Sequence, residues 1–252
     1  MRQMHSFRRL EVNGGRVLTG ETWRLELPPT AVGYTDAQLD DYGGQPRRAY
    51  PWRRGARMRV SARFSDSAES LLGTAGFGFW NAPFGDPTTR RPALPQAVWF
   101  FFGSPPTDLP LAPVGPGQGW FAATLDAGAP AALALTPLAP LAVLAHQFRP
   151  LRRRLWPRLQ RRLGIRYRAL AMDMRDWHTY TLVWGQTTCR FWVDEGLVLA
   201  TDCSPRGPLG WVCWLDNQML IATPRGRVRG GVLPTQRTQW LEIGRIELDS
   251  AD

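Results

Sequence analysis

The sequence contains no lysine and only three cysteines and three histidines. All 31 basic residues are therefore arginines. The few cysteines and histidines argue against a disulfide-rich protein and against a zinc protein. The cysteines are Cys189, Cys203 and Cys213, and the histidines are His5, His146 and His178. Three cysteines cannot all pair within one chain, and neither set has the spacing of a zinc site. The sequence therefore predicts no metal site and no cofactor.

Long apolar runs are also missing. The nearest approach is 128–145, which Pro130, Pro137 and Pro140 interrupt well short of the length that a spanning helix needs. The first twelve residues carry positive charge but no apolar core of the kind that secretory signals have. These two observations favour a cytoplasmic protein.

Acidic residues are absent between Asp126 and Asp173. The nine arginines of this stretch are Arg149, Arg152, Arg153, Arg154, Arg158, Arg161, Arg162, Arg166 and Arg168. The formal net charge of +10 falls to +1 when these nine are left out. The excess positive charge therefore belongs to one segment, and any polyanionic partner is expected to contact that segment.

The same segment has a helical pattern. Its apolar residues recur every three or four positions: Leu141, Leu144, Phe148, Leu151, Leu155, Leu159 and Leu163. The pattern predicts a basic amphipathic helical insertion at 127–172, with a break or kink near Pro150 and Pro157. In one interpretation Arg149, Arg152, Arg153, Trp156, Arg158, Arg161 and Arg162 contact an anionic membrane or a partner, so the protein is membrane-associated. In the other, the leucines pack on their own domain. Nucleic acid is less favoured, because Trp156 and Tyr167 are the only clear stacking rings.

Outside the insertion the apolar period is two, as in half-buried strands. Arg57–Phe64 alternates strictly, and Ala75–Trp80 and Ala97–Phe102 are short apolar runs typical of strands covered on both faces. Further strands are predicted at 22–27, 178–184, 188–194, 196–201, 208–215 and 239–248, and a loop at 224–231. Many short strands separated by Gly and Pro predict an all-β fold, a sandwich of two antiparallel sheets that forms one domain over 1–252.

One hairpin is more specific. Trp177–Trp184 (WHTYTLVW) followed by Cys189–Gly196 (CRFWVDEG) resembles a stretch of glycoside hydrolase family 16, and the 54–64, 73–80, 208–217 and 240–248 segments match its strands in pattern and order. The resemblance covers most of the chain outside 127–172. It implies a concanavalin A-like jelly roll with a concave cleft for polysaccharides. Members often hold a structural calcium, for which the resemblance would place Asp249.

The chemistry of that family does not carry over. Its catalytic strand reads E-x-D-x-E, which aims one nucleophilic and one acid/base carboxylate into the cleft. The corresponding strand here is 94–102 (LPQAVWFFF), which has no carboxylate. A relocated pair would join Asp40 or Asp41 to Asp216, because both regions flank the expected cleft. Alternatively, these aspartates have structural roles.

Aromatic and amide side chains predict the ligand site. Sugars stack on aromatic rings, and amides and carboxylates bind their hydroxyls. The candidates are Trp80, Asn81, Trp99, Trp214, Asp216, Asn217 and Gln218. Three functions stay open: a non-catalytic protein that binds a saccharide or glycoconjugate, a glycoside hydrolase with relocated carboxylates, and a peripheral membrane or scaffold protein that works through its basic insertion.

Overall fold

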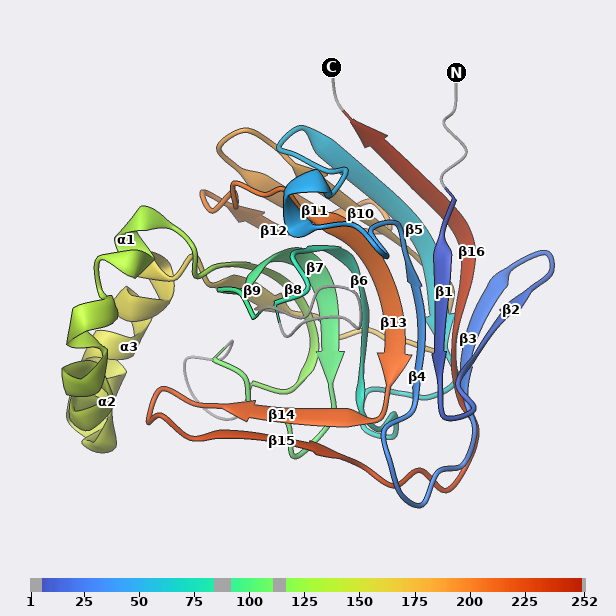
Figure 1. The fold of residues 1–252 in the computed structure, drawn as a ribbon, viewed down its shortest axis with the longest axis horizontal. Helices are drawn as coiled ribbons and strands as arrows, with labels where there is room; N and C mark the ends of the chain where they lie inside the picture. The colour runs from blue at the N-terminus through green and yellow to red at the C-terminus, as the bar shows by residue number, and fades with distance from the viewer. Residues whose placement is uncertain (1–5, 84–91, 111–116, 251–252) are drawn as a thin grey trace.

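Two seven-stranded antiparallel sheets form the body of the molecule in the computed structural model, which describes residues 6–83, 92–110 and 117–250. Sheet A has the order β1 (Arg8–Val12), β4 (Asp36–Asp40), β13 (Gly210–Asp216), β6 (Thr74–Trp80), β7 (Gln96–Gly103), β8 (Gly119–Asp126) and β9 (Arg166–Ala169). Sheet B has the order β12 (Gly196–Thr201), β11 (Cys189–Val193), β10 (His178–Trp184), β5 (Ala56–Phe64), β16 (Gln239–Ser250), β3 (Trp23–Leu27) and β2 (Arg16–Thr19). The predicted all-β sandwich is confirmed (Figure 1).

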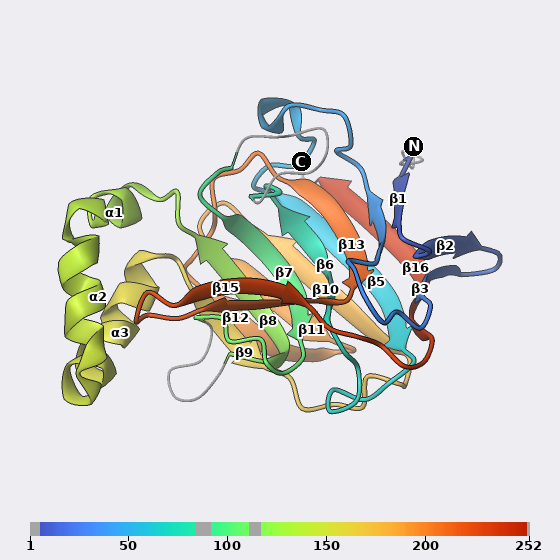
Figure 2. The same ribbon diagram turned by 60° about the horizontal axis from the view of Figure 1, so that its bottom comes forward.

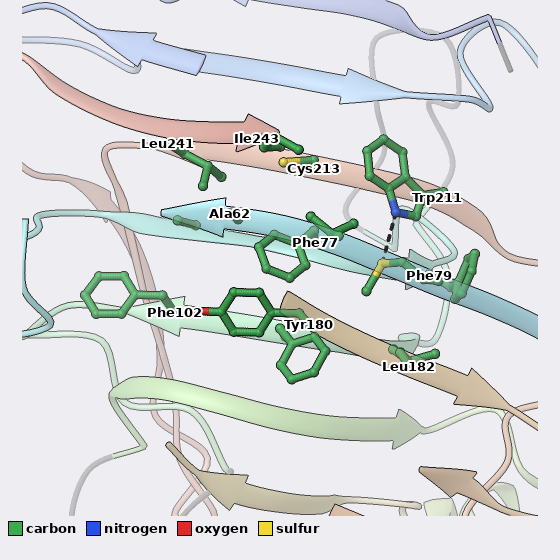
Figure 3. Packing of buried hydrophobic residues seen from close by; sticks show 14 of the residues in the cluster. Ala62, Phe77, Phe79, Phe102, Tyr180, Leu182, Trp211, Cys213, Leu241 and Ile243 are labelled. Carbon is green, nitrogen blue, oxygen red and sulfur yellow. Dashed lines mark hydrogen bonds between the residues drawn. The ribbon is translucent and has the colours of Figure 1, made fainter. Parts of the chain in front are cut away.

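Alternation along the strands builds the core between the sheets. On β5, Met58 and Val60 are fully buried while Arg57 and Arg59 point outward. From sheet A, Phe77 packs against Tyr180 of β10, with ring centroids 4.9 Å apart (Figure 3). Each such ring or aliphatic chain contributes about 1.5–3 kcal/mol when it is removed from water. On β5 of sheet B the buried face is thus the apolar half of a period-two pattern.

Sheet A also carries an apolar surface on the side turned away from sheet B, which we call its outer face. A second cluster of buried residues lies there, including Tyr42, Phe101, Phe121 and Trp214. This is why β6 and β7 have no polar half: both of their faces are covered. These buried side chains form an apolar layer on the outer face of sheet A.

A two-stranded ribbon, β14 (Gln218–Ala222) and β15 (Val228–Val232), extends from the end of β13. Figure 1 shows it running toward the helices below the strands of sheet A, and in Figure 2 it crosses in front of that sheet. Asp108, which follows β7, bridges to Ile221 on this ribbon. The loop predicted at 224–231 is therefore wrong in part, because β15 begins at Val228.

The helices lie between β8 and β9. They are α1 (Pro130–Leu133), α2 (Ala139–Gln147) and α3 (Arg149–Arg162), and short 3₁₀ turns lie at Thr136–Leu138 and, far from these helices in the sequence, at Arg47–Ala49. The predicted break near Pro150 occurs, but α3 continues through Pro157. The predicted insertion at 127–172 is too long, because β9 pairs with β8 as the edge strand of sheet A. Within the described residues, no helix has the length and apolar character to cross a bilayer.

Candidate functional site

Three tryptophans from three neighbouring strands gather on the outer face of sheet A. Trp80 ends β6, Trp99 lies in the middle of β7, and Trp214 lies on β13. The Trp80 and Trp214 rings are stacked, with centroids 6.0 Å apart and planes 5° from parallel. Trp99 lies 5.5 Å from Trp214 and 6.0 Å from Trp80. We call this group the tryptophan platform.

Glycines on β6 make room for the platform. Gly76 and Gly78 alternate with the core residues Phe77 and Phe79, so both glycines lie on the outer face. A Cβ on Gly76 would lie 2.9 Å from Trp214 Cη2, and one on Gly78 would lie 2.6 Å from Trp99 Cβ. Any larger side chain at these two positions would collide with the strand beside it and displace an indole.

The strand that resembles the family's catalytic strand contributes only apolar groups here. On β7, the residues that share the outer face with Trp99 are Ala97 and Phe101, and Phe101 is buried. Strand alternation sends Val98, Phe100 and Phe102 into the core instead. This strand therefore presents no nucleophile and no proton donor to the outer face.

A hydroxyl and an amide stand beside the platform. The Trp80 indole donates a hydrogen bond to the Tyr42 hydroxyl at 2.8 Å. The Gln38 side-chain amide donates to Asp40 Oδ2 at 2.9 Å and reaches Tyr42 Oη at 3.5 Å. Sequence reasoning missed Tyr42 and Gln38. The signal that could have found them was their closeness to the candidate aspartates: Gln38 lies on β4 two residues before Asp40, and Tyr42 directly follows Asp41 in the loop after β4.

Two predicted ligand residues have structural roles. Asn217 accepts from the Thr35 backbone N–H at 2.9 Å and donates to the carbonyls of Gly33 and Leu233 at 3.0 and 2.9 Å. Asn81 donates to the Leu94 carbonyl at 2.9 Å and accepts from the Gln96 N–H at 3.0 Å. Their amides hold loops in this structure, and ligand binding by these two residues stays a prediction.

Asp216 ends β13 and is buried, whereas Gln218 begins β14 and is exposed. Asp216 is buried and accepts from the Thr74 hydroxyl at 2.8 Å and the Gln218 N–H at 2.9 Å. The same Thr74 hydroxyl accepts from the Trp214 indole at 3.0 Å. Asp216 therefore orients the platform through Thr74. The Gln218 side chain is exposed at the start of β14.

The relocated pair proposed from the sequence does not form. Asp40 is held by Arg8 at 2.7 Å, and Asp41 accepts from the Trp211 N–H at 2.8 Å. In the β4–β13 register Asp216 stands opposite Asp36, four residues before Asp40. Four residues of strand separate Asp40 from Asp216 by about 13 Å, which is beyond the spacing of either hydrolytic mechanism.

A different pair of carboxyl groups lies close together on the outer face of sheet A. Asp36 and Asp216 are directly opposite across β4 and β13, and both are buried. Burial raises the pKa of Asp216 to about 6, and burial together with the Asp216 charge raises the pKa of Asp36 well above its usual range. The two groups thus differ in proton affinity. Asp36 was missed by sequence reasoning because β4 reads as a polar segment.

The helices bound the other end of the outer face. Trp156 of α3 is 5% exposed and belongs to the second cluster, and Leu159 and Leu163 pack against it. The prediction that Trp156 belongs to an exposed contact surface is therefore wrong. Its ring packs edge-on against the buried His146 of α2 at 5.7 Å, which ties the two helices together.

Among the described residues, no three His, Cys, Asp or Glu side chains converge as metal ligands would. Asp249, the residue where the resemblance would place calcium, stands opposite Arg57 in the β16–β5 register.

Comparison with known proteins gives a likeness in structure alone. No family profile matches this chain, and no curated protein sequence matches it. A β-glucanase from Bacillus licheniformis superposes with a TM-score of 0.50 at 9% identity, over 98% of this chain and 92% of that one. The chain has the jelly-roll fold of a glucanase. The predicted resemblance is thus confirmed at the level of the fold.

Two further solved structures are similar at lower scores. The catalytic domain of a laminarinase from Thermotoga petrophila has a TM-score of 0.47 at 12% identity, and a pseudo β-1,3-glucanase of Mycobacterium tuberculosis has 0.47 at 10%. Each match covers 92% of this chain and 78% of the other.

Proposed function

We propose that this protein binds a saccharide on the outer face of sheet A, with the tryptophan platform as its floor, and does not perform two-carboxylate retaining hydrolysis on β7. The observation that carries the proposal is the platform itself. Trp80, Trp99 and Trp214 meet on that face, where β7 adds only Ala97 and Phe101 beside Trp99. An aromatic floor of this kind binds sugar rings by contact and itself supplies no nucleophile or proton donor.

The platform matches the chemistry of pyranose rings. The C–H faces of a β-linked sugar are apolar, so they pack on indoles, while the ring edge presents hydroxyls. Tyr42 and Gln38 are buried beside Trp80, so they position its indole and do not contact the sugar. The ligand class that fits is therefore a β-linked glucan or galactan, or a glycoconjugate that carries one.

The three indoles differ in how much of each side chain is exposed to solvent. Trp80 and Trp99 are half-buried, whereas Trp214 is 7% exposed. Direct ring contact is therefore assigned to Trp80 and Trp99. Trp214 supports them, because its ring lies within 6.0 Å of both and its indole N–H is held by Thr74.

Calorimetric titration with laminari-, cello- and galacto-oligosaccharides tests the proposal. We expect Trp99→Ala to weaken binding by about tenfold, because a ring contact contributes about 1 kcal/mol beyond area burial. Trp192→Ala is the matched control, since Trp192 is a half-buried tryptophan on the outside of sheet B. Equal affinity of the Trp99→Ala variant and the wild type would remove the platform from the binding site.

The Asp36–Asp216 pair favours one second candidate, a glycoside hydrolase that uses these two carboxyls. Side chains directly opposite in an antiparallel pair have Cβ atoms about 4.5–5.5 Å apart, close to the carboxyl spacing of retaining enzymes. A reducing-end assay on the same glycans separates the candidates. This candidate requires product release that Asp216→Asn abolishes, and no release by the wild type would exclude it.

A further inference from the structure

The face of α2 and α3 that the sequence predicts to be apolar is largely uncovered. Its exposed members are Leu141, Leu144, Phe148, Leu151 and Leu155, and Leu138 of the preceding 3₁₀ turn is exposed beside them. Leu141 and Leu144 are 64% and 60% exposed, values far from those of packed leucines. Only Leu159 and Leu163, at the far end of α3, pack on the sandwich. The interpretation that the leucines pack on their own domain therefore holds for one end of the helix pair.

A second segment of the chain joins this surface. The turn between β14 and β15 meets α2, where the Gln147 side chain donates to the Arg225 carbonyl at 3.0 Å. A Cβ on Gly226 would lie 3.0 Å from Val143 Cγ1, so the two elements are in contact. Val228 follows with 75% exposure. Figures 1 and 2 show the ribbon and the helices together at one end of the molecule. We call α2, α3 and the turn between β14 and β15 the basic arm.

Positive charge surrounds the exposed apolar residues. α3 has seven arginines, and the ribbon adds Arg225, Arg227 and Arg229. Between Asp126 and Asp173 the sequence offers no acidic partner. The two guanidinium groups of α3 that do hydrogen-bond, Arg152 and Arg158, donate to the backbone carbonyls of His146 and Arg154. None of these ten arginines forms a salt bridge within the described part of the chain.

We propose that the basic arm docks on an anionic phospholipid bilayer. The leucines and Phe148 would enter the boundary between headgroups and acyl chains, and the arginines would bind the lipid phosphates around them. At 1.5 Å per residue, α2 and α3 are about 14 and 21 Å long, so they lie in the interface and do not cross it.

The exposed side chains of the basic arm favour a bilayer over a nucleic acid as the partner. Base stacking needs exposed rings, and Phe148 is the one aromatic side chain exposed on these helices, since Trp156 is buried. Aliphatic side chains gain nothing from a phosphate backbone, whereas they gain from leaving water for a lipid layer. The combination of exposed leucines and surrounding arginines therefore favours a lipid surface. This proposal does not depend on saccharide binding.

Flotation of the full chain with phosphatidylcholine vesicles, with and without phosphatidylglycerol, tests the proposal. We expect binding to the anionic vesicles alone, weakened when about 1 M salt shortens the Debye length from about 10 to 3 Å. The double variants Leu141→Ser/Leu144→Ser and Arg153→Glu/Arg154→Glu should each lose at least tenfold in vesicle affinity. Both change exposed side chains, so circular dichroism and Tm should stay at the wild-type values.

Matched controls lie at the other side of the sandwich. Leu197→Ser on β12 and Arg190→Glu on β11 change an exposed leucine and an exposed arginine outside the basic arm, and both should bind vesicles like the wild type. Equal binding to neutral vesicles, no vesicle binding, or unchanged affinity of the arm variants would overturn the proposal. So would binding of a single-stranded oligonucleotide in place of vesicles, or self-association that Leu141→Ser/Leu144→Ser abolishes while vesicles stay unbound.

Discussion

At the scale of single residues, the site depends on aspartates that are buried for different reasons. Asp40 forms an ion pair with Arg8, whereas Asp36 and Asp216 face each other and Asp36 Oδ1 has no hydrogen-bond partner within the described residues. Two carboxylates at this spacing cannot both ionise cheaply in a low dielectric. Their burial therefore makes the stability of the fold depend on pH.

The sign of that dependence follows from the raised pKa values. Below about pH 4 the carboxyls are protonated in both states, so burial costs little. As the pH rises, the unfolded chain ionises first while the folded chain keeps its protons, so the stability of the folded state falls. For Asp216 this happens between its ordinary pKa and about 6, and for Asp36 it extends higher. Asp41, whose pKa burial raises to about 7, acts in the same direction.

Asp36→Asn removes one of these groups and keeps an acceptor in place. We expect the free energy of unfolding of this variant to gain about 1–3 kcal/mol relative to the wild type between pH 4 and pH 8, because each pKa unit is worth about 1.4 kcal/mol. Urea titrations at several pH values measure the difference. Asp40→Asn is the control, since it breaks the Arg8 ion pair and should lose stability at pH 7. A difference between Asp36→Asn and the wild type that stays constant with pH would contradict the assignment.

At the scale of elements, the sequence predicted strands with a clear apolar pattern. It missed strands that are buried on both faces or that carry polar residues on a buried face. β10 and β12 were predicted to the residue. On β10 every second residue is buried, and β12 is a short apolar run that polar turn residues bound at both ends. β8 (GWFAATLD) is buried almost throughout, so it shows no alternation. β4 (DAQLD) reads as polar because its acids and amide lie on the outer face of sheet A.

The candidate site was predictable to a similar extent. Trp80, Trp99 and Trp214 were chosen as residues on cleft-facing strands, and they share the outer face of sheet A because strand alternation decides which side chains lie on one face. The hydrogen bonds of Asn81 and Asn217 could not be predicted, because the backbone groups that occupy their amides come from loops distant in sequence. The sequence predicted that the helical segment carries both arginines and an apolar face. It could not predict which leucines of that face stay exposed, because this depends on where the sandwich and the ribbon pack against the helices.

At the scale of the whole molecule, the basic arm and the tryptophan platform are built so that they can be separated. The ends of the helical segment lie side by side, because the Asp126 N–H donates to the Leu163 carbonyl at 3.1 Å. A short Gly/Ser linker in place of 130–162 would therefore close without straining β8 or β9. The cost is the loss of contacts that Trp156 and Leu159 make on the outer face.

We expect this deletion variant to keep the strand signal in circular dichroism and to lose several kcal/mol of unfolding free energy, since burial of each large apolar side chain contributes about 1.5–3 kcal/mol. It should bind more of a hydrophobic dye, because Phe121 and Ile165 become exposed, and it should bind oligosaccharides with wild-type affinity while it no longer floats with anionic vesicles. Calorimetry and flotation on the same preparation measure both properties. Loss of saccharide affinity in a variant that stays folded would show that the arm forms part of the sugar site, and that the two surfaces work as one.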